Sequence, residues 1–166
     1  MKLTAFDPDR DFDRIKDWIT DPRTHAMWCG NNFAFPLEKE NFKEVFSGFV
    51  QRAGDVPVLA LSDDGEAEGF FSWCVEPDTK ECLLKFVVVK PECRGSGTAR
   101  EMLRQAVDFA FTNTDAAAVH LKVFLENVRA KKCYDGVGFA ERSVKPASFT
   151  WEGERWRLCD MVIQKP

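Results

Sequence analysis

The chain has 166 residues, of which 45% are hydrophobic and 30% charged, a composition typical of one globular domain with its own core. Its net charge of -4 at pH 7 disfavours nucleic acid as a partner and suits cationic substrates such as amines. No secretory signal or membrane-spanning run is visible, and the six cysteines form no C-x-x-C pair. We therefore expect a reduced, cytoplasmic protein with one domain (residues 1–166), no membrane partner and no metal site.

In the first half of the chain, the hydrophobic pattern predicts one strand, two helices and then three strands. The expected elements are a strand at residues 2–6, a helix at 9–19, a helix starting near Pro36, and strands at 57–61, 69–75 and 82–89. A loop that includes residues 28–32 is expected between the two helices. The strand at 82–89 is apolar on both faces, so we expect it at the centre of the sheet.

The second half alternates helices with strands and closes with two strands. The expected elements are a helix at 99–110, a strand at 117–125, a short helix at 127–134, and strands at 139–142 and 155–164. The order β-α-α-β-β-β-α-β-α-β-β combines antiparallel hairpins with strand–helix–strand units. The predicted fold is therefore an α/β fold in which a mixed sheet has helices on both faces.

Residues 87–99 run from a β-branched strand through a proline and two glycines directly into a helix. Gly95 and Gly97 permit positive φ and let a ligand approach the backbone. The amides of the turn and the positive N-terminus of the helix then face one place, which suits a phosphate or pyrophosphate. Arg94 and Thr98 add polar donors. A plain strand-to-helix turn would use the same glycines, so the turn by itself leaves both interpretations open.

Tyr134 is the only tyrosine in a chain with fifteen phenylalanines. Where only packing is needed this sequence uses the phenyl ring, so the phenol indicates a role for its hydroxyl. Asn127, Ala130 and Tyr134 are spaced to share one face of the short helix. A phenol on the helix surface, bonded to a carbonyl, is the alternative interpretation.

Two motifs follow one another with about thirty residues between them. The first, V-x-P-x-x-R-G-x-G-x-A, runs from Val89 to Ala99, and the second, N-x-x-A-x-x-x-Y-x-x-x-G-F, runs from Asn127 to Phe139. In order, spacing and surrounding elements the chain resembles the GNAT superfamily of acyl-CoA-dependent N-acyltransferases. The resemblance implies a mostly antiparallel sheet of about seven strands in which a central strand is splayed from its neighbour.

The resemblance also implies acetyl-CoA as the cofactor and assigns residues to it. Backbone groups of Val87 and Val89 would bind the pantetheine arm, with Asn127 beside it. The pyrophosphate would lie on the glycine turn, which comprises Arg94, Gly95, Ser96, Gly97, Thr98 and Ala99. An amine would attack the acetyl carbonyl to give a tetrahedral intermediate, a backbone N–H of the bulged strand would stabilise the oxyanion, and Tyr134 would protonate the leaving thiolate.

Glu81 is the candidate general base, because one branch of the family carries its base at the start of the central strand. An exposed acid paired with Lys80 is the alternative interpretation, and a water chain would replace a side-chain base altogether. In the branch that acetylates ribosomal-protein N-termini, the base lies five residues before the asparagine. Lys122 occupies that position here, so the mechanism of that branch is not expected.

The family contacts its acceptor through the segment between the first two strands, where Trp28, Asn31 and Phe33 are the candidates in this chain. Core packing is the alternative for each of these side chains. The resemblance thus implies an N-acetyltransferase acting on a primary amine, carried by a small molecule or by a peptide or protein N-terminus. The resemblance is also compatible with a homodimer. The alternative is a non-catalytic acyl-CoA sensor or interaction domain with the same fold.

Overall fold

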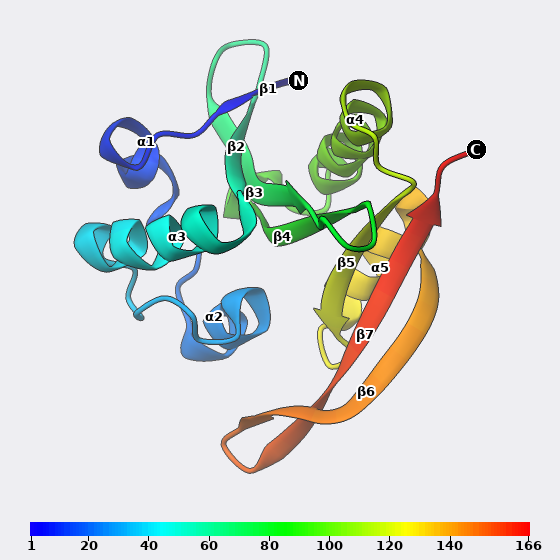
Figure 1. Ribbon diagram of the computed structural model, residues 1–166. Coiled ribbons are helices and arrows are strands. Elements are labelled where there is room, and N and C mark those ends of the chain that lie inside the picture. Colours follow the sequence, from blue (N-terminus) through cyan, green and yellow to red (C-terminus); the bar gives the residue numbers. More distant parts are fainter.

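The computed structural model describes residues 1–166, and its seven strands form one mixed sheet (Figure 1). The strands are β1 (Lys2–Ala5), β2 (Val56–Leu61), β3 (Ala67–Val75), β4 (Glu81–Val89), β5 (Ala118–Phe124), β6 (Ala140–Trp151) and β7 (Glu154–Gln164). They lie in the order β1-β2-β3-β4-β5-β7-β6. Only β4 and β5 pair in parallel. The predicted mixed, mostly antiparallel sheet is confirmed, with β4 at its centre.

Helices cover both faces of the sheet. They are α1 (Pro8–Ile15), α2 (Pro22–Cys29), α3 (Lys39–Ala53), α4 (Thr98–Asn113) and α5 (Val128–Val137), with one short 3-10 turn, η1 (Pro91–Cys93). A core that contains Met102, Leu121 and Tyr134 joins the sheet to α4 and α5. A second core, rich in phenylalanine, joins the opposite face to α1 and α3. No helix combines the length and the apolar character that crossing a membrane requires.

Three helices precede β2, where the sequence predicts two. The predicted helix at 9–19 is too long, because α1 ends at Ile15, and α2 occupies part of the predicted loop at 28–32. Local capping explains α2: the Asp21 carboxylate accepts a hydrogen bond from the Thr24 amide at 2.8 Å, and Pro22 stands in its first turn. Gly30, with a φ of 57°, ends the helix. These signals are too short-ranged to show in hydrophobic periodicity.

Candidate functional site

β4 and β5 pair only along their first halves. The parallel register runs from Glu81 opposite Ala118 to Leu84 opposite Leu121, and it stops there although both strands continue. On its other side β4 is bulged: Phe70 pairs with Val88, while two residues later on β3 the partner is Lys85. The extra residue is accommodated where Phe86 has a φ of 54°. The bulge turns β4 away from β5, which produces the predicted splay and leaves the facing edges of both strands unpaired beyond Leu84 and Leu121.

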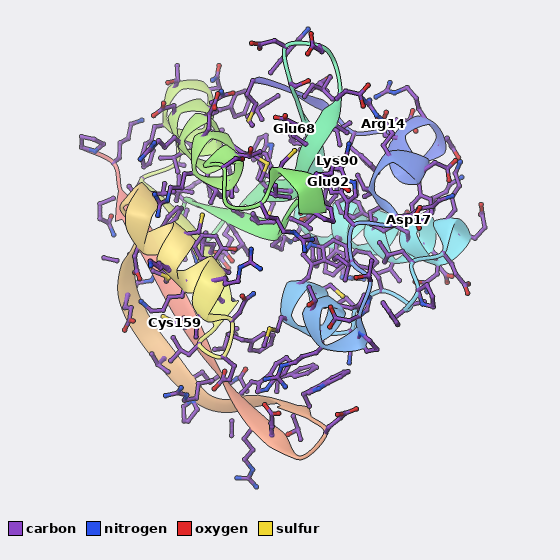
Figure 2. The ribbon with its side chains drawn as sticks, turned by 180° about the vertical axis from the view of Figure 1, so that it is seen from behind. Arg14, Asp17, Glu68, Lys90, Glu92 and Cys159 are labelled. Atoms are coloured by element: carbon purple, nitrogen blue, oxygen red, sulfur yellow. The ribbon has the colours of Figure 1, made fainter.

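A cleft of about 910 Å³ occupies the opening between the two strands. Its walls come from the second halves of β4 and β5, from α2 on one side and from the glycine turn and α5 on the other. Figure 2, seen from behind, shows α4 and α5 in front of the sheet, with Lys90 and Glu92 on the turn that leads into α4. Of the predicted site residues, those that line the cleft are Trp28, Val87, Val89, Arg94, Gly95, Gly97, Ala99, Asn127 and Tyr134.

The glycine turn presents a row of free amides at the start of α4. The backbone N–H groups of residues 95–100 make no hydrogen bond within the protein, and no side chain caps the helix. Gly95 and Gly97 have φ values of 81° and 96°, and a Cβ atom added at either would meet nothing within 4 Å. Unpaired amides, a helix N-terminus and open space are the three features that an anion requires. The turn therefore fits a phosphate or pyrophosphate.

The remaining polar groups of the turn hold it in shape. The Arg94 guanidinium donates to the carbonyls of Trp18 at 2.7 Å and Val89 at 3.1 Å. Ser96 Oγ lies 2.7 Å from the Cys93 carbonyl and 2.8 Å from the Thr98 hydroxyl. Ser96 and Thr98 do not line the cleft. Their side chains form hydrogen bonds within the loop, while the backbone N–H groups of the same residues have no partner in the protein.

Tyr134 lies on α5 with its ring in the core and its hydroxyl at the cleft. The residue is 8% exposed, and its hydroxyl makes no hydrogen bond within the protein. Burial raises the pKa of Tyr134 well above its usual value, so the hydroxyl keeps its proton at neutral pH. Burial likewise raises the pKa of the neighbouring Cys133 thiol, which disfavours a thiolate nucleophile there. The site thus offers a proton donor and no activated cysteine.

Asn127 begins α5, where its side-chain oxygen accepts a hydrogen bond from the Ala130 amide at 3.3 Å. This capping role was not part of the prediction, which placed Asn127 beside the pantetheine arm. Because Asn127 also lines the cleft, the two roles are compatible.

Glu81 does not line the cleft, and its position does not support the general-base hypothesis. Both of its carboxylate oxygens accept hydrogen bonds from Arg142 Nη1 at 2.8 Å. The physical reason is the parallel register, which places Glu81 beside Ala118 at the closed end of the β4–β5 pair. Lys80, the partner considered from the sequence, instead lies 3.7 Å from Asp115.

Among the candidate acceptor residues, only Trp28 lines the cleft. Its ring stacks on the ring of Phe33, and the two ring centroids lie 5.5 Å apart. The ring of the bulge residue Phe86 meets it edge-on, with 6.0 Å between centroids. Phe33 is buried in the phenylalanine-rich core, as expected if its side chain serves core packing and not acceptor binding. The Asn31 side-chain oxygen lies 3.3 Å from Nδ1 of the buried His25, away from the cleft.

A polar cluster that the sequence did not reveal surrounds His120 on β5. Its Nδ1 lies 3.0 Å from Asp160, and its Nε2 lies 3.2 Å from Glu76 and 4.0 Å from Glu81. One imidazole and two carboxylates at such distances suit a divalent cation. However, the Arg142 guanidinium already binds Glu81 and Asp160, so we interpret the cluster as an ion-pair network.

The sequence and the fold match known proteins. The sequence model of the acetyltransferase (GNAT) family matches residues 12–139. The chain belongs to this family. It is 34% identical over 55 residues to spermidine N(1)-acetyltransferase of Vibrio cholerae serotype O1, an alignment that covers 33% of this chain and 32% of that protein. The aligned segment thus spans about a third of the curated relative's length.

Solved structures of GNAT proteins share the fold almost end to end. A spermidine N-acetyltransferase from Vibrio cholerae, solved with CoA and spermine, has a TM-score of 0.81 at 20% identity, covering 98% of this chain and 94% of that one. A chimera of the Vibrio cholerae enzyme SpeG with hSSAT has a TM-score of 0.81 at 18% identity, with coverage of 98% and 94%. At these identities the likeness establishes the fold, so the fold implied by the two motifs is confirmed.

Proposed function

We propose that this protein is an acetyl-CoA-dependent N-acetyltransferase that transfers the acetyl group to a primary amine. The row of free amides at residues 95–100, opening on a cleft that continues along the unpaired edge of β4, is the observation that carries the proposal. Acetyl-CoA has a pyrophosphate at one end and supplies an activated acetyl thioester at the other. Membership of the GNAT family and the CoA-bound structural neighbour support the same cofactor.

Cationic side chains stand where the phosphates of such a cofactor would lie. Arg100 on α4 and Arg129 and Lys132 on α5 all line the cleft, and none of them has an ion-pair partner in the protein. Guanidinium and ammonium groups form strong hydrogen bonds with phosphate oxygens. These three side chains would therefore hold the charged end of the cofactor at the two helix starts.

The chemistry follows from the groups at the inner end of the cleft. The unpaired edge of β4 near Val87 offers backbone N–H groups that would bind the pantetheine arm and stabilise negative charge on the acetyl oxygen. As the N–C bond forms and the C–S bond breaks, Tyr134 would give its proton to the sulfur and regain one from solvent. The amine would lose its proton to water. This route uses Tyr134 as the general acid and needs no side-chain base.

Tyr134 also favours an enzyme over a non-catalytic acyl-CoA sensor. A sensor requires the glycine turn and the unpaired edge of β4 but not a protonated phenol at the cleft. The chain places its only tyrosine there with a free hydroxyl, whereas phenylalanine would fill the same core position.

The first test is calorimetric titration with acetyl-CoA of the wild type, Gly97→Trp and Gly65→Trp. Gly97 and Gly65 are matched, because both have positive φ, 96° and 82°, and both face open space. Gly65 lies in the β2–β3 turn, outside the cleft. We expect micromolar binding by the wild type and Gly65→Trp, and loss of binding by folded Gly97→Trp. Release of CoA in the presence of a panel of amines then tests turnover, and a folded wild type without binding contradicts the proposal.

A further inference from the structure

The acceptor is restricted by the charges that face it, an inference that rests on the proposed function. We propose that the acceptor amine also carries a carboxylate, that Lys122 binds this carboxylate, and that polyamines are poor substrates. The proposal therefore separates this chain from the spermidine acetyltransferases that it resembles.

Lys122 lies on the face of the sheet opposite the cofactor groups. Side chains alternate along β5, and its neighbours Leu121 and Val123 both point into the core shared with α4, α5 and Tyr134. Lys122 consequently points to the other face, on the side of α2, while still lining the cleft. The glycine turn and Tyr134 belong to the face that packs against α4 and α5. An acceptor that approaches from the face on the side of α2 would meet Lys122.

The Lys122 ammonium has no partner within the protein. The side chain is exposed and makes neither a hydrogen bond nor an ion pair. Lys85, the other lysine that lines the cleft from a strand, differs in this respect, because its ammonium lies 2.7 Å from the buried Asp55 carboxylate. Lys122 is therefore the ammonium available to a ligand on this face.

The cleft contains no available acid that would attract a polycation. Glu126 is the one carboxylate among the lining residues. It accepts hydrogen bonds from the Arg157 amide at 3.0 Å and from Arg157 Nε at 3.2 Å. A second ammonium of a polyamine would therefore meet Lys122 without a free carboxylate to balance it.

Other acids on the same face of the sheet are also paired. Asp160 stands opposite Lys122 in the β5–β7 register, yet it binds Arg142 at 2.7 Å and His120 at 3.0 Å. Glu81 is bound to the same guanidinium. Since these carboxylates already have cationic partners, they do not neutralise Lys122, and its positive charge remains exposed to the acceptor.

Paired acceptors of equal length make the test direct. The ω-amino acids from glycine to 6-aminohexanoate are compared with the corresponding α,ω-diamines and with spermidine, measuring kcat/KM by CoA release at low salt. We expect the amino acid of the best length to exceed its diamine by at least about tenfold, since a hydrogen bond between two charged groups is strong enough to give a preference of this size. Lys122→Gln should remove most of this preference, and Lys122→Glu should reverse it.

Lys145→Gln is the matched control, because Lys145 is also an exposed, unpaired strand lysine but lies outside the cleft. It should retain the wild-type preference, and the KM for acetyl-CoA should be unchanged in all variants. A wild type that prefers diamines overturns the inference and leaves the proposed function intact. An unchanged preference in Lys122→Gln removes the role of Lys122. If acetyl-CoA binds but no amine is acetylated, the proposed function fails and the inference fails with it.

Discussion

Tyr134 is the residue at which packing and chemistry can be separated by one oxygen atom. Its ring belongs to the core, with its centroid 6.2 Å from that of Phe139, while the residue also lines the cleft and its hydroxyl has no hydrogen-bond partner in the protein. Phenylalanine would keep the ring contacts, so Tyr134→Phe should fold normally. General acid catalysis typically contributes 10²–10⁴-fold, and we expect kcat to fall by about 100-fold or more. The KM for acetyl-CoA should change little, as measured by CoA release with the best acceptor.

The control for this variant is Tyr134→Leu, which removes both the oxygen and the ring. It should lose stability as well as activity, because it leaves a cavity in the core. Undiminished turnover by Tyr134→Phe would refute the general-acid role, whereas a wild type that binds acetyl-CoA but acetylates no amine would support the sensor alternative.

Residues of the glycine turn were predictable because their chemistry is local. Gly95 and Gly97 lie within a few residues of the strand end and helix start that they connect, so their positive φ values and free amides follow from the motif itself. Glu81 was not predictable in this way. Its partner Arg142 is 61 residues away in the sequence, and only the β4–β5 and β6–β7 registers bring the two together.

At the level of elements, strongly apolar strands are predictable and weakly patterned elements are not. The sequence predicts β4 at 82–89, and the structure places it at Glu81–Val89, because apolar residues on both faces mark a central strand. β6 extends to Trp151 rather than ending at residue 142. Most of its residues are exposed on the edge of the sheet, so no alternation marks its length. α2 is identified by its caps, not by periodicity.

The start of α5 gives a test of capping against cofactor contact. Asn127→Ala removes the acceptor of the Ala130 amide, and loss of such a cap typically costs about 1 kcal/mol of stability. Asn127→Ser retains a capping oxygen on a shorter side chain, so it should unfold at close to the wild-type temperature. Thermal unfolding of the three proteins measures this difference.

The serine variant also isolates the second role of Asn127. If the amide contacts the pantetheine arm, Asn127→Ser should raise the KM for acetyl-CoA while the unfolding temperature stays near that of the wild type. A normal KM in this variant would leave capping as the only role of the residue. Equal unfolding temperatures for Asn127→Ala and the wild type would contradict the cap itself.

Across the whole molecule, the His120 cluster joins parts of the sheet that are distant in sequence. It links the β3–β4 turn through Glu76, the start of β4 through Glu81, and β7 through Asp160. Arg142 of β6 binds two of these acids, so one guanidinium connects the edge of the sheet to its centre. No local pattern predicts such a network, since each pair depends on strand order and register.

The network makes stability depend on pH in a direction that can be tested. Burial acts to raise the pKa of Asp160, but hydrogen bonds from His120 and Arg142 outweigh it and hold the pKa below its usual value. The folded protein then binds fewer protons at this site than the unfolded chain does. The stabilisation is present above the unfolded pKa of about 3.9 and is lost as the pH falls through the lower, folded value.

Asp160→Asn should therefore destabilise the protein at pH 6 by more than at pH 3, because below the unfolded pKa the unfolded chain takes up a proton that the folded carboxylate resists, and the stabilisation from the charge declines. Urea unfolding of both proteins between pH 3 and pH 6 measures the difference in the free energy of unfolding at each pH. Asp78→Asn is the control, since Asp78 is an exposed turn acid without an ion pair and should give a difference close to zero throughout. A difference between Asp160→Asn and the wild type that stays constant across this range would show that the Asp160 charge does not stabilise the sheet.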